Sequence, residues 1–253
     1  MNEISRRRLI KTGLVAAGGV AGLGAAARIA KRTGLIPPDC RGAYGAGETL
    51  TYASQRVLTL NKTVREFPRD MISKAPFANE VDPPTDEYKK LQAGGFRDWR
   101  LVVDGMVDHP LTLSLADLRS MPVRSQITEI GCEEGWTYIA EWIGTPLNEV
   151  LKEAGLHPDV RFIFYRSMDK MGWWESIDIA EAQHPQTLLT MGMNDGELPI
   201  GFGGPLRLRL PRQLGYKSLK YVVHLTATDS MKKFGKGLGS IDPEGGYSWY
   251  AGI

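Results

Sequence analysis

Short apolar runs and apolar–polar alternation recur from Trp99 onward, and this pattern predicts a series of β-strands. The first two predicted strands, 100–103 and 106–107, flank Asp104-Gly105, a pair that accepts the positive φ angles of a type I′ turn. We therefore expect a tight hairpin there. The remaining predicted strands cover residues 124–130, 162–165, 187–191, 206–210 and 221–226.

Three short helices are predicted between these strands. Ser114 is a suitable cap for a helix ending at Ser120. Apolar residues recur at helical spacing over 147–154, and Gly155 ends that run. Residues 178–181 have the spacing of a capping box for a third helix. Many strands with short interspersed helices predict a β-rich, mixed α+β domain.

The first residues have the composition of an export signal. A basic region at 5–8 precedes a weakly hydrophobic, Gly- and Ala-rich run over 13–30. The paired arginines with Leu9 and Lys11 resemble a twin-arginine signal, which implies the twin-arginine export machinery and a periplasmic location. A plain membrane anchor explains the same run, and an uncleaved signal would tether the protein to the membrane.

Turn-forming residues punctuate the stretch between this signal and the first strand. Pro-Pro pairs and clustered glycines over 34–95 predict an irregular segment that wraps a core built by later residues. We therefore expect three parts: an export signal at 1–33, a wrapping segment at 34–95 and a globular domain at 96–253.

Charge and cysteine content narrow the chemistry. The 253 residues include 31 Lys and Arg and 29 Asp and Glu, and this near balance predicts no nucleic-acid binding. The four histidines lie far apart, without the spacing of a zinc site. Two cysteines are too few for an iron–sulfur cluster, and no haem-attachment motif occurs. A metal centre would therefore have to arrive with a cofactor.

Cys132 is the first candidate for such chemistry. It lies in Gly131-Cys132-Glu133-Glu134-Gly135 at the end of a predicted strand, where a loop thiolate is free to bind a metal. Two other interpretations stay open at this point. A lone cysteine also serves as a small core residue, and in an exported chain Cys132 could form a disulfide with Cys40.

Glycines and cations gather in a second stretch, 201–220. Glycine lets backbone N–H groups approach an anion, and the cations Arg207, Arg209, Arg212, Lys217 and Lys220 supply charge-assisted hydrogen bonds to phosphate. The glycines precede a strand instead of opening a helix, so this is neither a Walker loop nor a dinucleotide fingerprint. A glycine turn beside a solvated basic edge is the alternative.

Together with His-Pro-Gln-Thr-Leu at 184–188, these stretches resemble the sulfite-oxidase-type molybdopterin domain over roughly residues 96–230. Within that superfamily the chain looks closer to the exported bacterial catalytic subunit that reduces protein methionine sulfoxides. Its size is the reason, because it leaves no room for the dimerisation domain that sulfite oxidases carry. The resemblance implies a β-rich α+β fold of that type.

The resemblance also assigns residues. Cys132 falls on the molybdenum-ligating cysteine, and Arg207 falls on the arginine that holds the cofactor phosphate. Phe202 is a departure, because relatives place Asn or His there and a phenyl ring cannot hydrogen-bond the pterin. That contact must be lost or supplied by a neighbour. The other positions matching cofactor-binding residues are Asn79, Ser167, Ser218, Leu219 and Lys220.

Oxygen-atom transfer is the chemistry that the resemblance implies. Molybdopterin would carry the molybdenum, and the Cys132 thiolate would complete its protein ligation, which excludes a disulfide with Cys40. The implied substrate is a sulfoxide such as methionine sulfoxide. Electrons would come from an external protein, either a membrane haem protein or a soluble cytochrome, since the chain lacks haem and iron–sulfur sites.

Two rival functions remain open. The first is oxidation of sulfite or another small molecule by the same family of enzymes. The second is a cofactor-free exported binding domain that carries a Cys40–Cys132 disulfide.

The substrate site has several candidate residues. Arg166 and Lys170 either bind an oxyanion substrate or belong to a solvated loop without a binding role. Trp173 and Trp174 have two interpretations: they form the wall of an apolar pocket that binds a thioether, or they are buried core residues. The carboxylates after Cys132 are proton relays or exposed loop groups.

Overall fold

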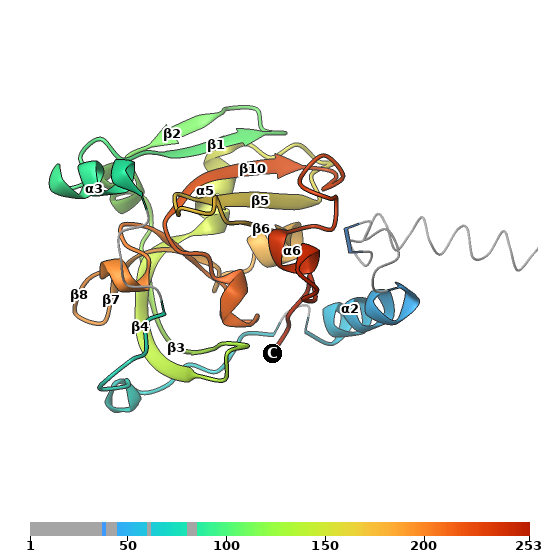
Figure 1. Ribbon diagram of the computed structural model, residues 1–253, viewed down its shortest axis with the longest axis horizontal. Helices are drawn as coiled ribbons and strands as arrows, with labels where there is room; N and C mark the ends of the chain where they lie inside the picture. Colours follow the sequence, from blue (N-terminus) through green and yellow to red (C-terminus); the bar gives the residue numbers. More distant parts are fainter. Residues whose placement is uncertain (1–36, 39–44, 60–61, 80–84) are drawn as a thin grey trace, which may run out of the picture. The chain divides into compact units, whose positions relative to one another are not determined.

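Two sheets of five strands each, one mixed and one antiparallel, organise the part of the chain that the structure, a computed structural model, describes: residues 37–38, 45–59, 62–79 and 85–253. The first sheet has the order β2 (Leu111–Leu113), β1 (Leu101–Gly105), β10 (Val222–Thr228), β5 (Phe162–Ser167) and β6 (Trp174–Asp178). The second has β3 (Arg124–Gly131), β4 (Thr137–Pro146), β7 (Leu188–Met193) and β8 (Gly196–Glu197), with β9 (Arg207–Arg209) on β7. The long β3–β4 hairpin curves below the first sheet in Figure 1.

The three predicted helices form where the capping residues indicated. Ser114 and Asp117 make a reciprocal capping box at the start of α4 (Leu115–Ser120). Gly155, in the left-handed conformation, ends α5 (Leu147–Ala154), and Asp178 caps α6 (Ile179–Ala182). A fourth short helix, α7 (Ile241–Glu244), follows the last strand. The predicted β-rich α+β class is confirmed.

Apolar faces of both sheets and of α5 meet in the largest core. Val103 and Leu225 contribute from the first sheet, Leu189 and Leu208 from the second, and Leu151 from α5, all of them buried. Each fully buried side chain of this kind stabilises the fold by about 1.5–3 kcal/mol. The core holds the two sheets in one unit, so β9 and the β3–β4 hairpin keep a fixed relation.

The tight hairpin predicted at Asp104-Gly105 is wrong. Both residues continue β1, which runs parallel to β10, and β2 begins only at Leu111. A Cβ atom at Gly105 would lie 2.2 Å from the Ala227 carbonyl oxygen. Glycine is needed here because the neighbouring backbone approaches closely and φ is positive, not because the chain turns.

The prediction of an irregular segment over 34–95 is wrong for two stretches, which form α2 (Gly45–Thr59) and α3 (Asp86–Ala93). The helix α2 has no apolar stripe facing the core, because its inner face carries charge. Arg56 bonds both Asp178 and Glu181, and the Tyr52 hydroxyl donates to Asp178 at 2.7 Å. A search for apolar periodicity does not detect such a helix.

Residues 62–79, which we call the crossing segment, cross the outer face of the β3–β4 hairpin. The Phe67 N–H donates to the Ile127 carbonyl on β3, and the Ser73 N–H donates to the Ile139 carbonyl on β4, each at 2.9 Å. Between these bonds, the short 3₁₀ turn η1 (Arg69–Met71) places Arg69 against Glu141. The segment thereby delivers residues 74–79 to the end of the hairpin that carries Cys132.

Two sequence predictions concern residues that the structure does not describe. The expected export signal at 1–33 and Cys40 lie outside the described residues. No helix among the described residues is long and apolar enough to cross a membrane.

We expect Arg56→Ala to lower the free energy of unfolding by about 3–5 kcal/mol, because it leaves Asp178 and Glu181 buried with one cation fewer. Denaturant unfolding followed by circular dichroism measures the change. Arg69→Ala is the control, because its ion pairs are half exposed and we expect a much smaller effect. Equal losses in the two variants would show that the buried ion pairs do not hold α2.

Candidate active site

Cys132 occupies the turn that joins β3 to β4. Its N–H donates to the Trp136 carbonyl at 2.9 Å, and the Gly135 N–H returns to the Cys132 carbonyl at 3.1 Å. Gly135 has φ +89°, which favours glycine in a turn this tight. The thiol is free and half-buried, and it donates to a Glu133 carboxylate oxygen at 3.0 Å. The side chain is therefore fixed in place and open to a ligand on one side.

The surroundings of this thiol disfavour its ionisation. Burial raises the pKa of Cys132 to about 12, and the hydrogen bond to Glu133 and the charge of both neighbouring glutamates act in the same direction. A bound metal cation reverses this balance, because it stabilises the thiolate directly. The site thus suits a cysteine that is protonated when alone and ionised when it is a ligand.

The glycine-rich stretch folds back onto Cys132. At the short 3₁₀ turn η3 (Gly215–Lys217), a Cβ atom added to Gly215 would lie 3.4 Å from the Cys132 Cβ atom. The buried Lys217 ammonium pairs with Glu175, and the Lys217 carbonyl accepts from the Tyr165 hydroxyl at 2.8 Å. The first sheet therefore anchors the loop that contacts Cys132.

Arg207 and Arg209 form a buried cationic pair on β9. Alternation along the strand puts both on one face, and their guanidinium carbons lie 5.6 and 5.4 Å from the centre of the Trp142 ring. Arg207 donates to the Phe202 carbonyl at 3.1 Å, and Arg209 donates to the Glu129 carbonyl at 2.5 Å. These partners are uncharged.

Neither guanidinium pairs with a carboxylate anywhere in the described ranges, and each Nε atom is buried without a hydrogen-bond partner. Burial, together with the smaller effect of the Arg207 charge, lowers the pKa of Arg209 to about 9. Two desolvated cations without a counter-ion create a strong demand for an anion. The pair is thus suited to a phosphate-bearing ligand.

Comparison with known proteins identifies the family. Residues 89–234 match the family described as "Oxidoreductase molybdopterin binding domain". The chain belongs to this family. Its cofactor is therefore molybdopterin, its activity is that of an oxidoreductase, and its fold class is the one that the sequence motifs predicted.

Several relatives have related names. A putative protein-methionine-sulfoxide reductase subunit YedZ1 of Azospira oryzae is 33% identical over 192 residues, which cover 76% of this chain and 69% of the relative. The protein-methionine-sulfoxide reductase catalytic subunit MsrP of Ralstonia nicotianae is 29% identical over 243 residues, covering 89% and 73%. The sulfane dehydrogenase SoxCD of Paracoccus pantotrophus has a similar fold, with a TM-score of 0.51 and 24% identity over 53% of this chain and 39% of that one.

The arginine pair of this molybdopterin oxidoreductase fits the cofactor. When bound, the cofactor supplies two-electron oxygen-atom transfer at its metal. Arg207 and Arg209 would hold its phosphate, because they are the buried cations that lack a counter-ion. Cys132, which contacts the same glycine-rich stretch through Gly215, would ligate the metal.

Lys220 and Asn79 meet beside the glycines. The Lys220 ammonium donates to the Asn79 carbonyl and, at 2.6 Å, to the Gly201 carbonyl. A Cβ atom at Gly203 would lie 2.9 Å from the Lys220 Cβ atom, so glycine allows the lysine stem to lie on the loop. Asn79 contacts Lys220 through its backbone, so this contact gives its side-chain amide no role.

Of the other predicted cofactor residues, Ser218 and Leu219 bond β9 and the residue after it, whereas Ser167 lies at the end of β5. The Ser218 hydroxyl accepts from the Leu210 N–H at 3.0 Å and lies 3.5 Å from Arg209, and the buried Leu219 holds Leu208 through its carbonyl. Ser167, at the end of β5, accepts from the Asp169 N–H at 3.1 Å. The structure therefore places Ser218 beside the arginine pair and shows no contact between Ser167 and Cys132.

Tyr138 is the polar neighbour of Phe202. The Phe202 ring packs edge-on against the Tyr138 ring at 5.8 Å, and the Tyr138 hydroxyl interacts with Arg207. The polar group that Phe202 lacks is thus present on its neighbour. Sequence reasoning missed Tyr138, gave Trp142 no role, and placed Arg209 among the anion-binding cations without pairing it with Arg207. The period-two alternation of β4 and β9 was the signal that placed them on one face.

Other candidates from the sequence have packing roles. Trp174 stacks on Phe164 at 5.5 Å, and Trp173 packs against the largest core, so neither forms a pocket wall at Cys132. Arg166 and Lys170 are exposed. Glu134 accepts from the Trp136 indole N–H at 2.6 Å.

The motif at 184–188 holds the crossing segment in place. The Gln186 side chain makes two hydrogen bonds to the backbone of Val64, at 2.8 and 3.2 Å. His184 lies 3.2 Å from the Lys62 carbonyl, and burial together with the charge of Arg212 lowers its pKa to about 4. This motif therefore positions the chain that reaches the site.

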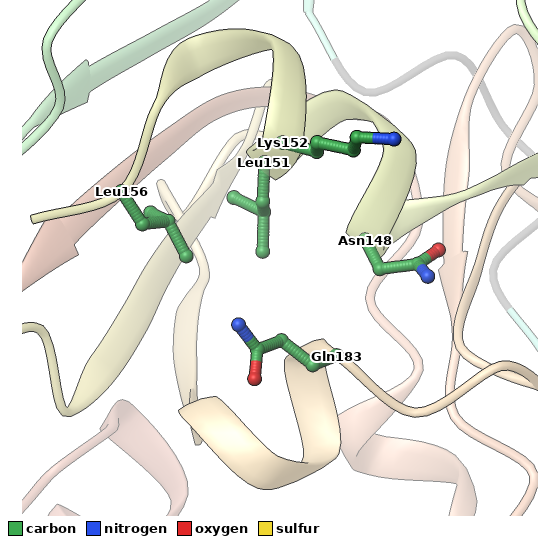
Figure 2. A pocket seen from close by; sticks show the side chains of 5 residues that line it. All are labelled: Asn148, Leu151, Lys152, Leu156 and Gln183. Carbon is green, nitrogen blue, oxygen red and sulfur yellow. The ribbon is translucent and has the colours of Figure 1, made fainter. Parts of the chain in front are cut away.

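A pocket elsewhere on the surface is separate from this chemistry. It lies between α5 and the end of α6, and the side chains that face it in Figure 2 include no nucleophile and none of the predicted cofactor residues. They are Asn148, Leu151, Lys152, Leu156 and Gln183. In addition, no group of three or more His, Cys, Asp or Glu side chains within the described residues could hold a metal ion.

We expect Arg209→Met to lower molybdenum per purified chain by about tenfold without destabilising the cofactor-free protein, because an unpaired buried cation adds little to stability. Metal analysis and thermal unfolding measure the two effects. Arg212→Met is the control, since Arg212 pairs with the buried Glu181 and its loss should lower the unfolding temperature. If Arg209→Met unfolds the cofactor-free protein as readily as Arg212→Met, the pair is structural.

In the cofactor-free protein, Cys132 should resist alkylation at pH 8, because a thiol with pKa 12 is only about one part in ten thousand thiolate there. Its rate should be more than about a hundredfold below that of free cysteine and should rise with pH until the pKa is passed. Mass spectrometry of the labelled peptide measures it. Glu133→Gln should accelerate the reaction, and an unchanged rate would rule out the influence of that carboxylate.

Proposed function

We propose that this molybdopterin oxidoreductase reduces a sulfoxide, with methionine sulfoxide as the substrate class. The sulfoxide accepts two electrons and two protons, its sulfur–oxygen bond breaks, and a thioether and water leave. Relatives named protein-methionine-sulfoxide reductase support the proposal. Cys132 would be the metal ligand, and the other residues assigned from the sequence would hold the cofactor.

The charges around Cys132 carry the proposal. Glu133 and Glu134 adjoin the thiol, whereas Arg207 and Arg209 are buried beneath the aromatic side chains of β4. A neutral sulfoxide can approach past two carboxylates, but an anion such as sulfite is repelled by them. This arrangement favours sulfoxide reduction over sulfite oxidation.

A cofactor-free binding domain is less well supported. It would leave two buried guanidinium groups without an anion, which is costly in a stable fold. The Cys132 thiol is also free.

The location and the electron source belong to the same proposal. A twin-arginine signal would export the protein after it has folded around its cofactor, and the periplasm would be its working compartment. An uncleaved signal would tether it to the membrane. A membrane haem protein or a soluble cytochrome would supply the electrons, since neither haem nor iron–sulfur motifs occur in the sequence.

Natively expressed protein should contain close to one molybdenum per chain and should reduce methionine sulfoxide with a reduced viologen dye as electron donor. Cys132→Ser should lose more than about a hundredfold in turnover, because the metal loses its protein ligand. The matched control is Cys40→Ser, which should retain turnover. Oxidation of sulfite without reduction of sulfoxide would favour the rival enzyme, and matured protein without molybdenum would contradict both.

A further inference from the structure

An aromatic shelf, Phe77 and Trp136, lies beside Cys132. The two ring centres are 5.4 Å apart. Phe77 comes from the crossing segment, which precedes the residues that match the family, whereas Trp136 belongs to the Cys132 turn. The shelf is thus built by two segments that are distant in sequence.

The shelf is fixed in position relative to the thiol. The Trp136 carbonyl accepts the Cys132 N–H at 2.9 Å, and its indole N–H donates to Glu134 at 2.6 Å. Its ring stacks on Tyr138, with centres 5.7 Å apart and planes inclined by 11°. On the other side, the bonds between Ser73 and Ile139 hold the crossing segment to β4 four residues before Phe77. The Trp136 ring is thus held on several sides, and the backbone that carries Phe77 is tied to the same hairpin.

The shelf is nevertheless open to solvent. Phe77 is 53% exposed and Trp136 is partly buried. A single exposed apolar residue needs no explanation, but two contacting rings at the turn that carries the candidate metal ligand form an apolar surface next to the candidate site. Sulfur groups make favourable contacts with aromatic rings.

We propose that Phe77 and Trp136 bind the side chain of a peptide methionine sulfoxide and so select it over small hydrophilic sulfoxides. This inference rests on the proposed sulfoxide reduction. The methylene groups and the S-methyl group would pack on the rings, which leaves the sulfoxide oxygen free to face the metal that Cys132 would ligate. The shelf determines specificity and takes no part in the breaking of the sulfur–oxygen bond.

The test compares steady-state constants of molybdenum-loaded wild type and Phe77→Ala on two substrates, a peptide containing methionine sulfoxide and dimethyl sulfoxide. We expect Phe77→Ala to raise KM for the peptide about fivefold with little change in kcat, because one face of the contact is lost. KM for dimethyl sulfoxide should change by less than about twofold. Phe77→Tyr keeps the ring and should restore the peptide KM.

Met71→Ala is the matched control, because Met71 is an exposed apolar residue of the same segment, in η1. It should leave both KM values unchanged, and molybdenum per chain should be equal in all variants. If Phe77→Ala keeps its turnover and its KM for the peptide is unchanged, the proposed role of the shelf in substrate binding is wrong. The proposal of sulfoxide reduction would not be affected by that result. If loaded wild type reduces neither sulfoxide, both proposals fall.

Discussion

Two buried guanidinium groups without a carboxylate partner are the interaction on which the site depends. Arg207 and Arg209 reach their position because β9 pairs with β7 and because Trp142 offers a flat aromatic face. Such a pair is unfavourable by itself, and only an anionic ligand offsets the repulsion and the lost hydration. The fold thus carries two uncompensated positive charges that the phosphate of molybdopterin would neutralise.

The sequence predicted those features that depend on local chemistry. The capping box at Ser114 and the left-handed Gly155 are decided by residues within one helical turn, and both were correct. Cys132 and Arg207 were found through motifs. Whether each has the role that those motifs imply stays a prediction.

The remainder depends on residues that are distant in the chain. Helix α2 was missed because Arg56 finds its partners in Asp178 and Glu181, and no local pattern signals a charged inner face. Gly105 looked like a turn residue, although its role is to let the β10 backbone approach. Arg209 was placed among the anion-binding cations, but its burial against Trp142 with an unpartnered Nε depends on contacts with residues distant in the chain.

The crossing segment has a consequence for the order of assembly. It is synthesised early, yet its contacts are with Ile127, Ile139 and Gln186, and its last residue meets Lys220. Contacts of such long sequence separation form only after most of the chain exists. Phe77 and Asn79 therefore reach Trp136 and Lys220 late in folding, after these partners have been synthesised.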